Sequence, residues 1–140
     1  DKVFQRVVDA LRPGAIVLHT DHAPEDRRRR LLDAGVQLVT GEADERGRVA
    51  IVHALAALGR LPIRSMLVEG GGHLLASFVA AAAWERWYWF QAPRLLGDGA
   101  PVLPGLSWPS VAQSPRLWIE LRSRVGGDDL LVLQPESPAP

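Results

Sequence analysis

The sequence contains no cysteine, which excludes disulfides, thiolate nucleophiles, iron–sulfur clusters and cysteine-based zinc sites from these 140 residues. It also lacks a long apolar run: the longest, residues 74–84, has 11 residues even when Ser77 is counted. A membrane helix needs about 20, so no membrane partner is expected. Positive charge is not in excess either, because 16 basic residues balance 16 acidic ones. A neutral chain gives no support for a nucleic-acid partner, and the absence of cysteine is compatible with the cytoplasmic location that we expect.

The composition is that of a folded globular domain. Apolar residues make up 47% of the 140 residues and charged residues 23%, close to the averages for globular proteins. This length is typical of one domain. We therefore expect a single domain over residues 1–140.

Strand and helix patterns alternate over the first 84 residues. Helical spacing of apolar residues, strand-like runs and Gly or Pro breaks predict helices at 3–11, 24–34, 49–58 and 74–84, with strands at 15–19, 36–39 and 65–69. This alternation predicts an α/β fold with a mostly parallel sheet and flanking helices.

The pattern changes after residue 84. An aromatic, strand-like run at 86–91 is followed by a long segment rich in Pro and Gly at 93–115. Two further strand-like runs, 117–125 and 130–133, are separated by Gly126, Gly127, Asp128 and Asp129. Turn residues between apolar runs predict an antiparallel hairpin at the C-terminal end.

The segment most informative about function is a predicted strand, three glycines (Gly70, Gly71 and Gly72) and a predicted helix, in direct succession. Glycines let backbone amides approach a ligand closely, and a helix N-terminus favours an anion such as phosphate. Ser77, within the first two turns, is positioned to add a hydroxyl. The alternative is a tight turn without a ligand, and the pattern alone does not decide between them.

Glu69 ends the predicted strand directly before the glycines, so its carboxylate is expected at the carboxyl edge of the sheet, where open α/β sheets bind ligands. There it can hold sugar hydroxyls. A pairing with a nearby arginine, or a cap on the following helix, is an equal alternative. His73 begins the helix and either faces a cofactor or is solvated.

Three other clusters are interpreted as structural. His19 and His22 flank Asp21, but no third His or Cys stands at ligand spacing, so we expect no metal site. Arg27–Arg30 occupy four successive helical positions that point in different directions, which indicates a solvated helix surface. The aromatic residues between Trp84 and Phe90 favour sheet packing or a subunit interface over base stacking.

Three ordered motifs, residues 67–78 (LVEGGGHLLASF), 92–97 (APRLLG) and 125–130 (VGGDDL), resemble the reductase domain of riboflavin biosynthesis, the C-terminal half of a bifunctional deaminase/reductase in bacteria. The resemblance implies a dihydrofolate-reductase-like fold that uses NADPH to reduce the ribosyl group of 5-amino-6-(5-phosphoribosylamino)uracil to ribityl. It places the substrate against Glu69. It also places the cofactor phosphates against the glycine turn and the helix after it: Gly70, Gly71, Gly72, His73, Leu74, Leu75, Ala76 and Ser77.

The resemblance also shows what this sequence lacks. The family's domain is longer, and its first part, with the residues that hold the substrate phosphate, is not recognisable here. No residue is therefore assigned as catalytic, and a truncated, non-catalytic module that binds a nucleotide or dimerises stays an alternative. The family resemblance implies a homodimer, and we expect its contact at the hairpin that carries Trp118.

Overall fold

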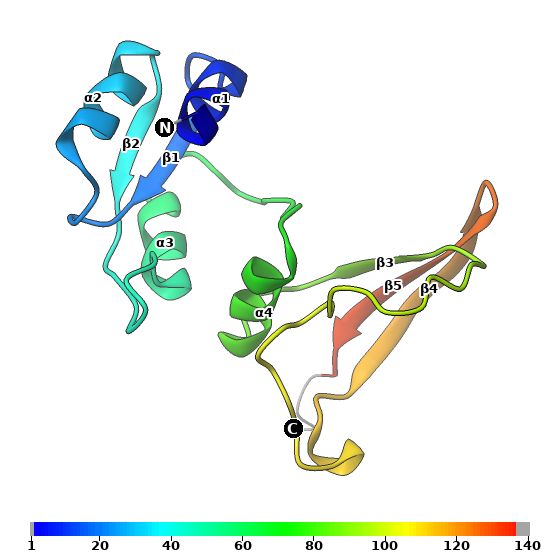
Figure 1. The fold of residues 1–140 in the computed structure, drawn as a ribbon. Coiled ribbons are helices and arrows are strands. Elements are labelled where there is room, and N and C mark those ends of the chain that lie inside the picture. Colours follow the sequence, from blue (N-terminus) through cyan, green and yellow to red (C-terminus); the bar gives the residue numbers. More distant parts are fainter. Residues whose placement is uncertain (1, 137–140) are drawn as a thin grey trace. The chain divides into compact units, whose positions relative to one another are not determined.

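The computed structural model describes residues 2–136. The chain divides into two compact units, unit 1 (Asp1–Leu67) and unit 2 (Val68–Pro140), which the structure describes over residues 2–67 and 68–136. The two units divide the chain between the third and fourth helices (Figure 1). Within residues 2–136, every helix is too short to cross a membrane. Whether the units form one domain, as expected from the length, stays a prediction.

Unit 1 contains three helices around a parallel pair of strands. Its elements are α1 (Lys2–Ala10), β1 (Ile16–His19), α2 (Glu25–Asp33), β2 (Gln37–Thr40) and α3 (Ile51–Leu58). The strands pair in parallel, from Ile16 opposite Gln37 to His19 opposite Thr40. The predicted elements of this region are therefore confirmed up to α3, with shifts of a few residues at their ends.

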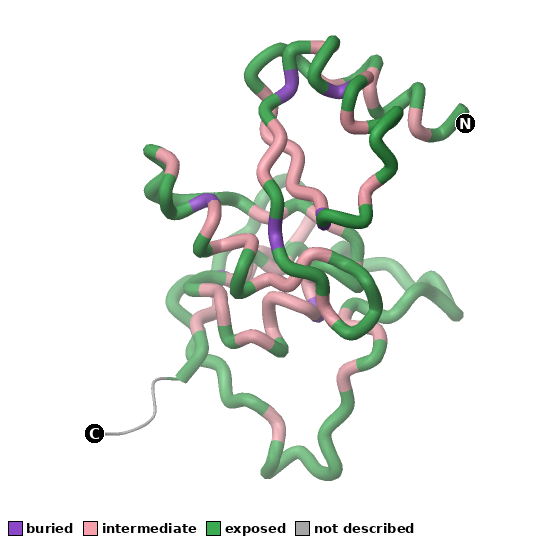
Figure 2. Tube along the Cα trace, turned by 90° about the vertical axis from the view of Figure 1, so that its left-hand side faces the viewer, coloured by how far each residue is buried: buried purple, intermediate pink, exposed green. Residues whose placement is uncertain are grey.

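The local sequence explains where α2 begins and ends. Pro24 precedes the helix, and Glu25 and Asp26 place negative charge at the positive end of its dipole. Gly35 follows the helix with φ of +74°, a left-handed conformation that favours glycine. Buried positions are few along the trace (Figure 2). Leu31 of α2 and Val36 are among them, and both belong to the small core of unit 1.

The arginine run of α2 is not simply solvated. The guanidinium groups of Arg27 and Arg30 lie over the ring of Phe4 in α1, at 5.1 and 5.0 Å from its centroid. Arg28 forms an ion pair with Glu25 at 2.8 Å. Arg27 and Arg29 are exposed, as expected of a solvated helix surface. The aromatic ring on the neighbouring helix adds an attraction for the positive charge of Arg27 and Arg30 that the sequence did not predict.

The strand expected at 65–69 does not form. These residues belong to no helix or strand in the described chain, and Met66 and Leu67 are 47% and 70% exposed. A strand needs a hydrogen-bonded neighbour, and β1 and β2 pair only with each other. The expectation of a mostly parallel sheet is thus wrong for the described residues, whose parallel part is one pair of strands.

The described part of unit 2, residues 68–136, contains one α-helix and an antiparallel sheet of three strands. Its elements are α4 (Gly72–Ala80), β3 (Trp87–Gln91), a short 3₁₀ turn η1 (Val111–Gln113), β4 (Leu117–Val125) and β5 (Asp128–Pro135). The strand order is β3-β5-β4, with both pairings antiparallel. The predicted C-terminal hairpin and aromatic strand are confirmed, and the described chain is a mixed α/β structure.

The register of this sheet separates two apolar faces. Trp87 and Trp89 lie opposite Leu133 and Leu131, on the face that also carries Ile119. The other face carries Tyr88, Phe90, Trp118, Leu121 and the buried Val132. Except for Val132, the side chains of this second set are half or more exposed.

The carboxylate of Glu120 links all three strands of the sheet. Glu120 lies at an irregularity of β4, between Ile119 and Leu121. Arg86, directly before β3, donates from Nε and Nη2, which share one edge of its guanidinium group, to the two carboxylate oxygens at 2.7 and 3.1 Å. Gln134 of β5 donates to the same carboxylate at 2.7 Å. The hydrogen bonds from Arg86, and then that from Gln134, lower the pKa of Glu120 below its ordinary value of 4.5.

We expect Glu120 to make the stability of unit 2 sensitive to acid. A carboxylate whose pKa is lower in the folded state stabilises the fold above its unfolded pKa and loses that effect as pH falls through its folded pKa. The difference in unfolding free energy between the wild type and Glu120→Gln should therefore be constant near neutral pH and shrink below the ordinary value of 4.5. Denaturant unfolding at a series of pH values measures it, with Glu45→Gln, an exposed carboxylate in unit 1, as the control. Parallel pH curves for the wild type and Glu120→Gln would contradict this account.

Candidate functional site

The glycine turn leads directly into α4, as the sequence predicts. Gly71 is the residue before the helix, with φ of −68° and ψ of 165°, and α4 begins at Gly72. The carbonyl of Gly71 accepts hydrogen bonds from the amides of Leu74 (2.9 Å) and Leu75 (3.2 Å). These bonds close the first turn of the helix and set the direction of its axis.

The first turn of α4 has donors without acceptors. Within residues 2–136, the amides of Gly71, Gly72 and His73 donate to no backbone carbonyl, and no side chain caps the helix. Unpaired amides at a helix N-terminus carry a partial positive charge, which favours an anion. The turn therefore offers what a phosphate group requires.

The three glycines have different surroundings. A methyl group added at Gly70 would lie 2.5 Å from Cδ2 of Leu74, and one at Gly72 would lie 2.8 Å from the carbonyl oxygen of Val102. At Gly71 an added methyl group would meet nothing within 4 Å. None of the three has a positive φ. Glycine is thus needed at 70 and 72 for space, whereas Gly71 borders open space in which a ligand can approach the backbone.

Glu69 is exposed at the entrance to this turn. Within the described part of unit 2, residues 68–136, it forms no ion pair and caps no helix, so neither structural alternative is realised there. Its carboxylate is accessible to a ligand beside the open amides. The assignment of Glu69 to substrate stays a prediction.

The predicted residues of α4 are not equally accessible. His73 and Leu74 are exposed and Leu75 is half-buried, whereas Ala76 is 6% exposed and belongs to the core of unit 2. The hydroxyl of Ser77 donates to the carbonyl of His73 at 2.9 Å, within the helix. The structure therefore brings Glu69, the glycines and His73 together at the open end of the helix, with Ala76 buried behind them.

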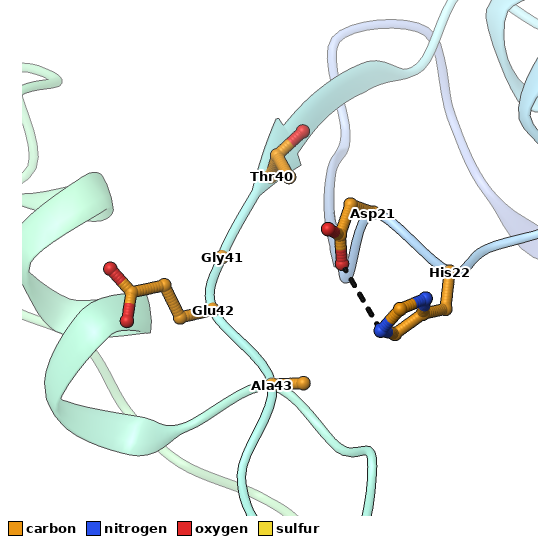
Figure 3. A pocket seen from close by; sticks show the side chains of 6 residues that line it. All are labelled: Asp21, His22, Thr40, Gly41, Glu42 and Ala43. Atoms are coloured by element: carbon orange, nitrogen blue, oxygen red, sulfur yellow. Dashed lines mark ion pairs between the residues drawn. The ribbon is translucent and has the colours of Figure 1, made fainter.

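Unit 1 has a separate cavity, of about 410 Å³, at the carboxyl ends of β1 and β2. Asp21 and His22 turn toward each other in it, 3.7 Å apart (Figure 3). Glu42 points away from that pair, and its carboxylate meets His53 at 3.1 Å. Six residues line the cavity: Asp21, His22, Thr40, Gly41, Glu42 and Ala43.

Sequence reasoning interpreted His22 and Asp21 as plain loop residues and did not foresee this cavity. The sequence could have predicted this cavity from the two parallel strands that precede its lining residues, because loops that follow parallel strands meet at the carboxyl edge of the sheet. With two carboxylates in its lining, the cavity does not favour phosphate. No group of three metal-ligating side chains gathers anywhere in the part of the chain that the structure describes.

Comparisons with known proteins identify the family of the chain. The sequence model of the RibD C-terminal domain matches residues 3–132. The chain is 30% identical, over 112 residues, to the riboflavin biosynthesis protein RibD of Bacillus amyloliquefaciens, covering 79% of this chain but 29% of that protein.

Solved structures share the fold. A pyrimidine reductase-like protein of Corynebacterium diphtheriae superposes with a TM-score of 0.71 at 18% identity, over 88% of this chain and 50% of the other. RibD of Acinetobacter baumannii (form 2) gives a TM-score of 0.64 at 20% identity, over 86% of this chain and 37% of the other. The family match covers nearly the whole sequence, glycine turn and hairpin included, and the chain therefore belongs to the RibD C-terminal domain family.

Proposed function

We propose that this chain is an NADPH-dependent reductase domain that converts the ribosyl group of 5-amino-6-(5-phosphoribosylamino)uracil to ribityl in riboflavin biosynthesis. The observation that carries the proposal is the first turn of α4, where three amides have no backbone acceptor and Gly71 borders open space. A dinucleotide cofactor needs such a place for its phosphates. Membership of the RibD C-terminal domain family supports the same function.

Different groups of the glycine turn would bind the cofactor and the substrate. The amides of Gly71, Gly72 and His73 would hold a cofactor phosphate, and the carboxylate of Glu69 would hold hydroxyls of the substrate. Exposed Leu74 would border the cofactor. When bound, NADPH would supply the hydride that reduces the sugar carbon.

The chain spans 29% of the length of the curated relative that it matches. The reductase activity is therefore a proposal for this chain. We propose that residues 1–140 form one dihydrofolate-reductase-like domain without the N-terminal part that holds the substrate phosphate in the family. A cytoplasmic location agrees with a chain that has no cysteine to oxidise.

The second candidate is a non-catalytic module that dimerises, and unit 2 has a sheet face suited to such a contact. One face of the three-stranded sheet exposes Tyr88 (50%), Phe90 (59%), Trp118 (65%) and Leu121 (50%). Large apolar side chains gathered on one face are typical of a protein interface. We propose that this face, including the hairpin with Trp118, forms the contact of a homodimer, whether or not the chain is catalytic.

Turnover by the 140-residue protein separates the two candidates. The chain is incubated with NADPH and the pyrimidine substrate, while the absorbance of NADPH and the ribityl product are followed. We expect NADPH to bind with a Kd between about 1 μM and 1 mM, the range of ordinary enzyme substrates. Product formation would exclude the non-catalytic module, binding without product would favour it, and the absence of both would contradict the proposed reductase.

A further inference from the structure

The chain leaves β3 at Gln91 and runs through a long irregular segment (Figure 1). Residues 101–104 of this segment lie against Gly72 at the N-terminus of α4, and we call them the strap. It lies within the long Pro/Gly segment that the sequence indicates. The residues before it are strongly exposed: Leu95 is fully exposed and Leu96 is 89% exposed. Leu103 and Pro104 of the strap are half-buried. The strap is thus a short anchored piece of an otherwise exposed segment.

The first anchor is Gly72. A methyl group there would lie 2.8 Å from Cδ of Pro104, 2.8 Å from the carbonyl oxygen of Val102 and 2.9 Å from that of Pro101. Carbon atoms do not approach backbone oxygens this closely, so the strap occupies space that any side chain at 72 would need. Two carbonyl oxygens also lie near the positive end of α4, which is electrostatically favourable.

The second anchor is the side chain of Leu103. It lines an apolar groove of about 310 Å³ on the face of the sheet that carries Ile119, together with Trp87, Trp89, Leu117, Leu131 and Leu133. Leu103 stands between Val102 and Pro104, whose atoms meet Gly72. One short segment therefore joins the groove of the sheet to the first turn of α4.

We propose that Gly72 and Leu103 are positioning residues, which hold the strap against the first turn of α4 so that it forms one wall of the cofactor site. This inference rests on the proposed function. A wall held in place before binding excludes water from one side of the amides of Gly72 and His73. It also spares the cofactor the entropic cost of ordering the segment, because a preformed site binds more tightly than one ordered on binding.

The experiment compares two pairs of variants of the 140-residue protein. Gly72→Ala is paired with Gly71→Ala, whose methyl group meets nothing, and Leu103→Ala is paired with Val102→Ala, whose side chain is 44% exposed. Amide hydrogen exchange of Leu106, whose amide donates to the carbonyl of Leu103 at 3.3 Å, reports the order of the strap in the absence of cofactor. NADPH titration reports binding, and exchange within α4 and the sheet shows that unit 2 remains folded.

We expect Gly72→Ala and Leu103→Ala to speed strap exchange and to weaken NADPH binding, each by about tenfold or more, with the rest of unit 2 still protected. Gly71→Ala and Val102→Ala should leave strap exchange unchanged. Unchanged exchange in both test variants would contradict the role of Gly72 and Leu103 in holding the strap. Faster exchange with unchanged NADPH affinity would contradict the role of the strap as a wall of the cofactor site. If the wild type itself binds no NADPH, the proposed function and the wall both fail, while exchange still decides whether Gly72 and Leu103 anchor the strap.

Discussion

Replacing Gly71 by Asp should weaken NADPH binding by about 100-fold or more while leaving α4 folded. Gly71 precedes the helix with φ of −68° and ψ of 165°, a conformation that Asp adopts readily, and a Cβ atom added there meets no atom within 4 Å. Asp is also a favourable residue at this position, because its carboxylate accepts hydrogen bonds from the first-turn amides. The substitution therefore gives the open amides an internal acceptor where the phosphate should bind.

The expected size of the effect follows from what the phosphate loses. Hydrogen bonds to charged groups contribute about 1.5–3 kcal/mol each, so the loss of one or two, with repulsion from the new carboxylate added, corresponds to about 100-fold. Fluorescence titration of NADPH measures the affinity, and a thermal melt checks that the Tm is unchanged or higher.

Gly71→Asn is the matched control for charge, since Asn caps a helix about as well as Asp without a negative charge. It should bind NADPH more weakly than the wild type and more tightly than Gly71→Asp. Equal NADPH affinity of the wild type and Gly71→Asp would show that no cofactor phosphate binds at the first turn of α4, and would contradict the proposed cofactor site.

Replacing Trp118 by Glu should convert a dimer into a monomer. Trp118 is 65% exposed on the sheet face that also exposes Tyr88 and Phe90. Loss of a central Trp from an interface costs about 2 kcal/mol or more. In a two-fold symmetric interface the same residue is lost from both copies, so the total is about 4 kcal/mol, or about 1,000-fold in the dissociation constant.

Sedimentation over a range of protein concentrations measures the dissociation constant of the wild type and of the variant. Val111→Glu is the control, because Val111 is 90% exposed but lies in η1, outside the sheet. It should leave the dimer intact. A wild type that is monomeric at every concentration, or a Trp118→Glu variant that still dimerises, would rule out this face as the contact.

Local patterns were sufficient to predict most elements of the chain. The acidic residues Glu25 and Asp26 mark the start of α2, and Gly35 marks its end. Gly126 has φ of +61°, a conformation that favours glycine, and it forms the turn that joins β4 to β5. Such signals act through residues close in sequence, so they are visible without a structure. The apolar run at 65–69 has the composition of a strand too, but composition does not supply the neighbouring strand with which it must pair.

The candidate site divides in the same way. Its existence after Gly70–Gly72 and the start of α4 follow from the order of residues, because a helix N-terminus after glycines leaves amides open whatever surrounds it. The different surroundings of Gly71 and Gly72 do not follow from that order. They depend on the strap, which is about 30 residues away in the sequence.

The sequence by itself determined the helices, the hairpin, the glycine turn and, through three ordered motifs, the family of this protein. The tertiary structure alone decided that parallel pairing within residues 2–136 is limited to β1 and β2, that Ala76 is buried while Gly71 borders open space, and that Arg27 and Arg30 lie over Phe4. The physical reason is the range of the forces concerned. Turn and helix-end preferences arise within a few residues, whereas strand pairing and burial require partners that only the folded chain brings together.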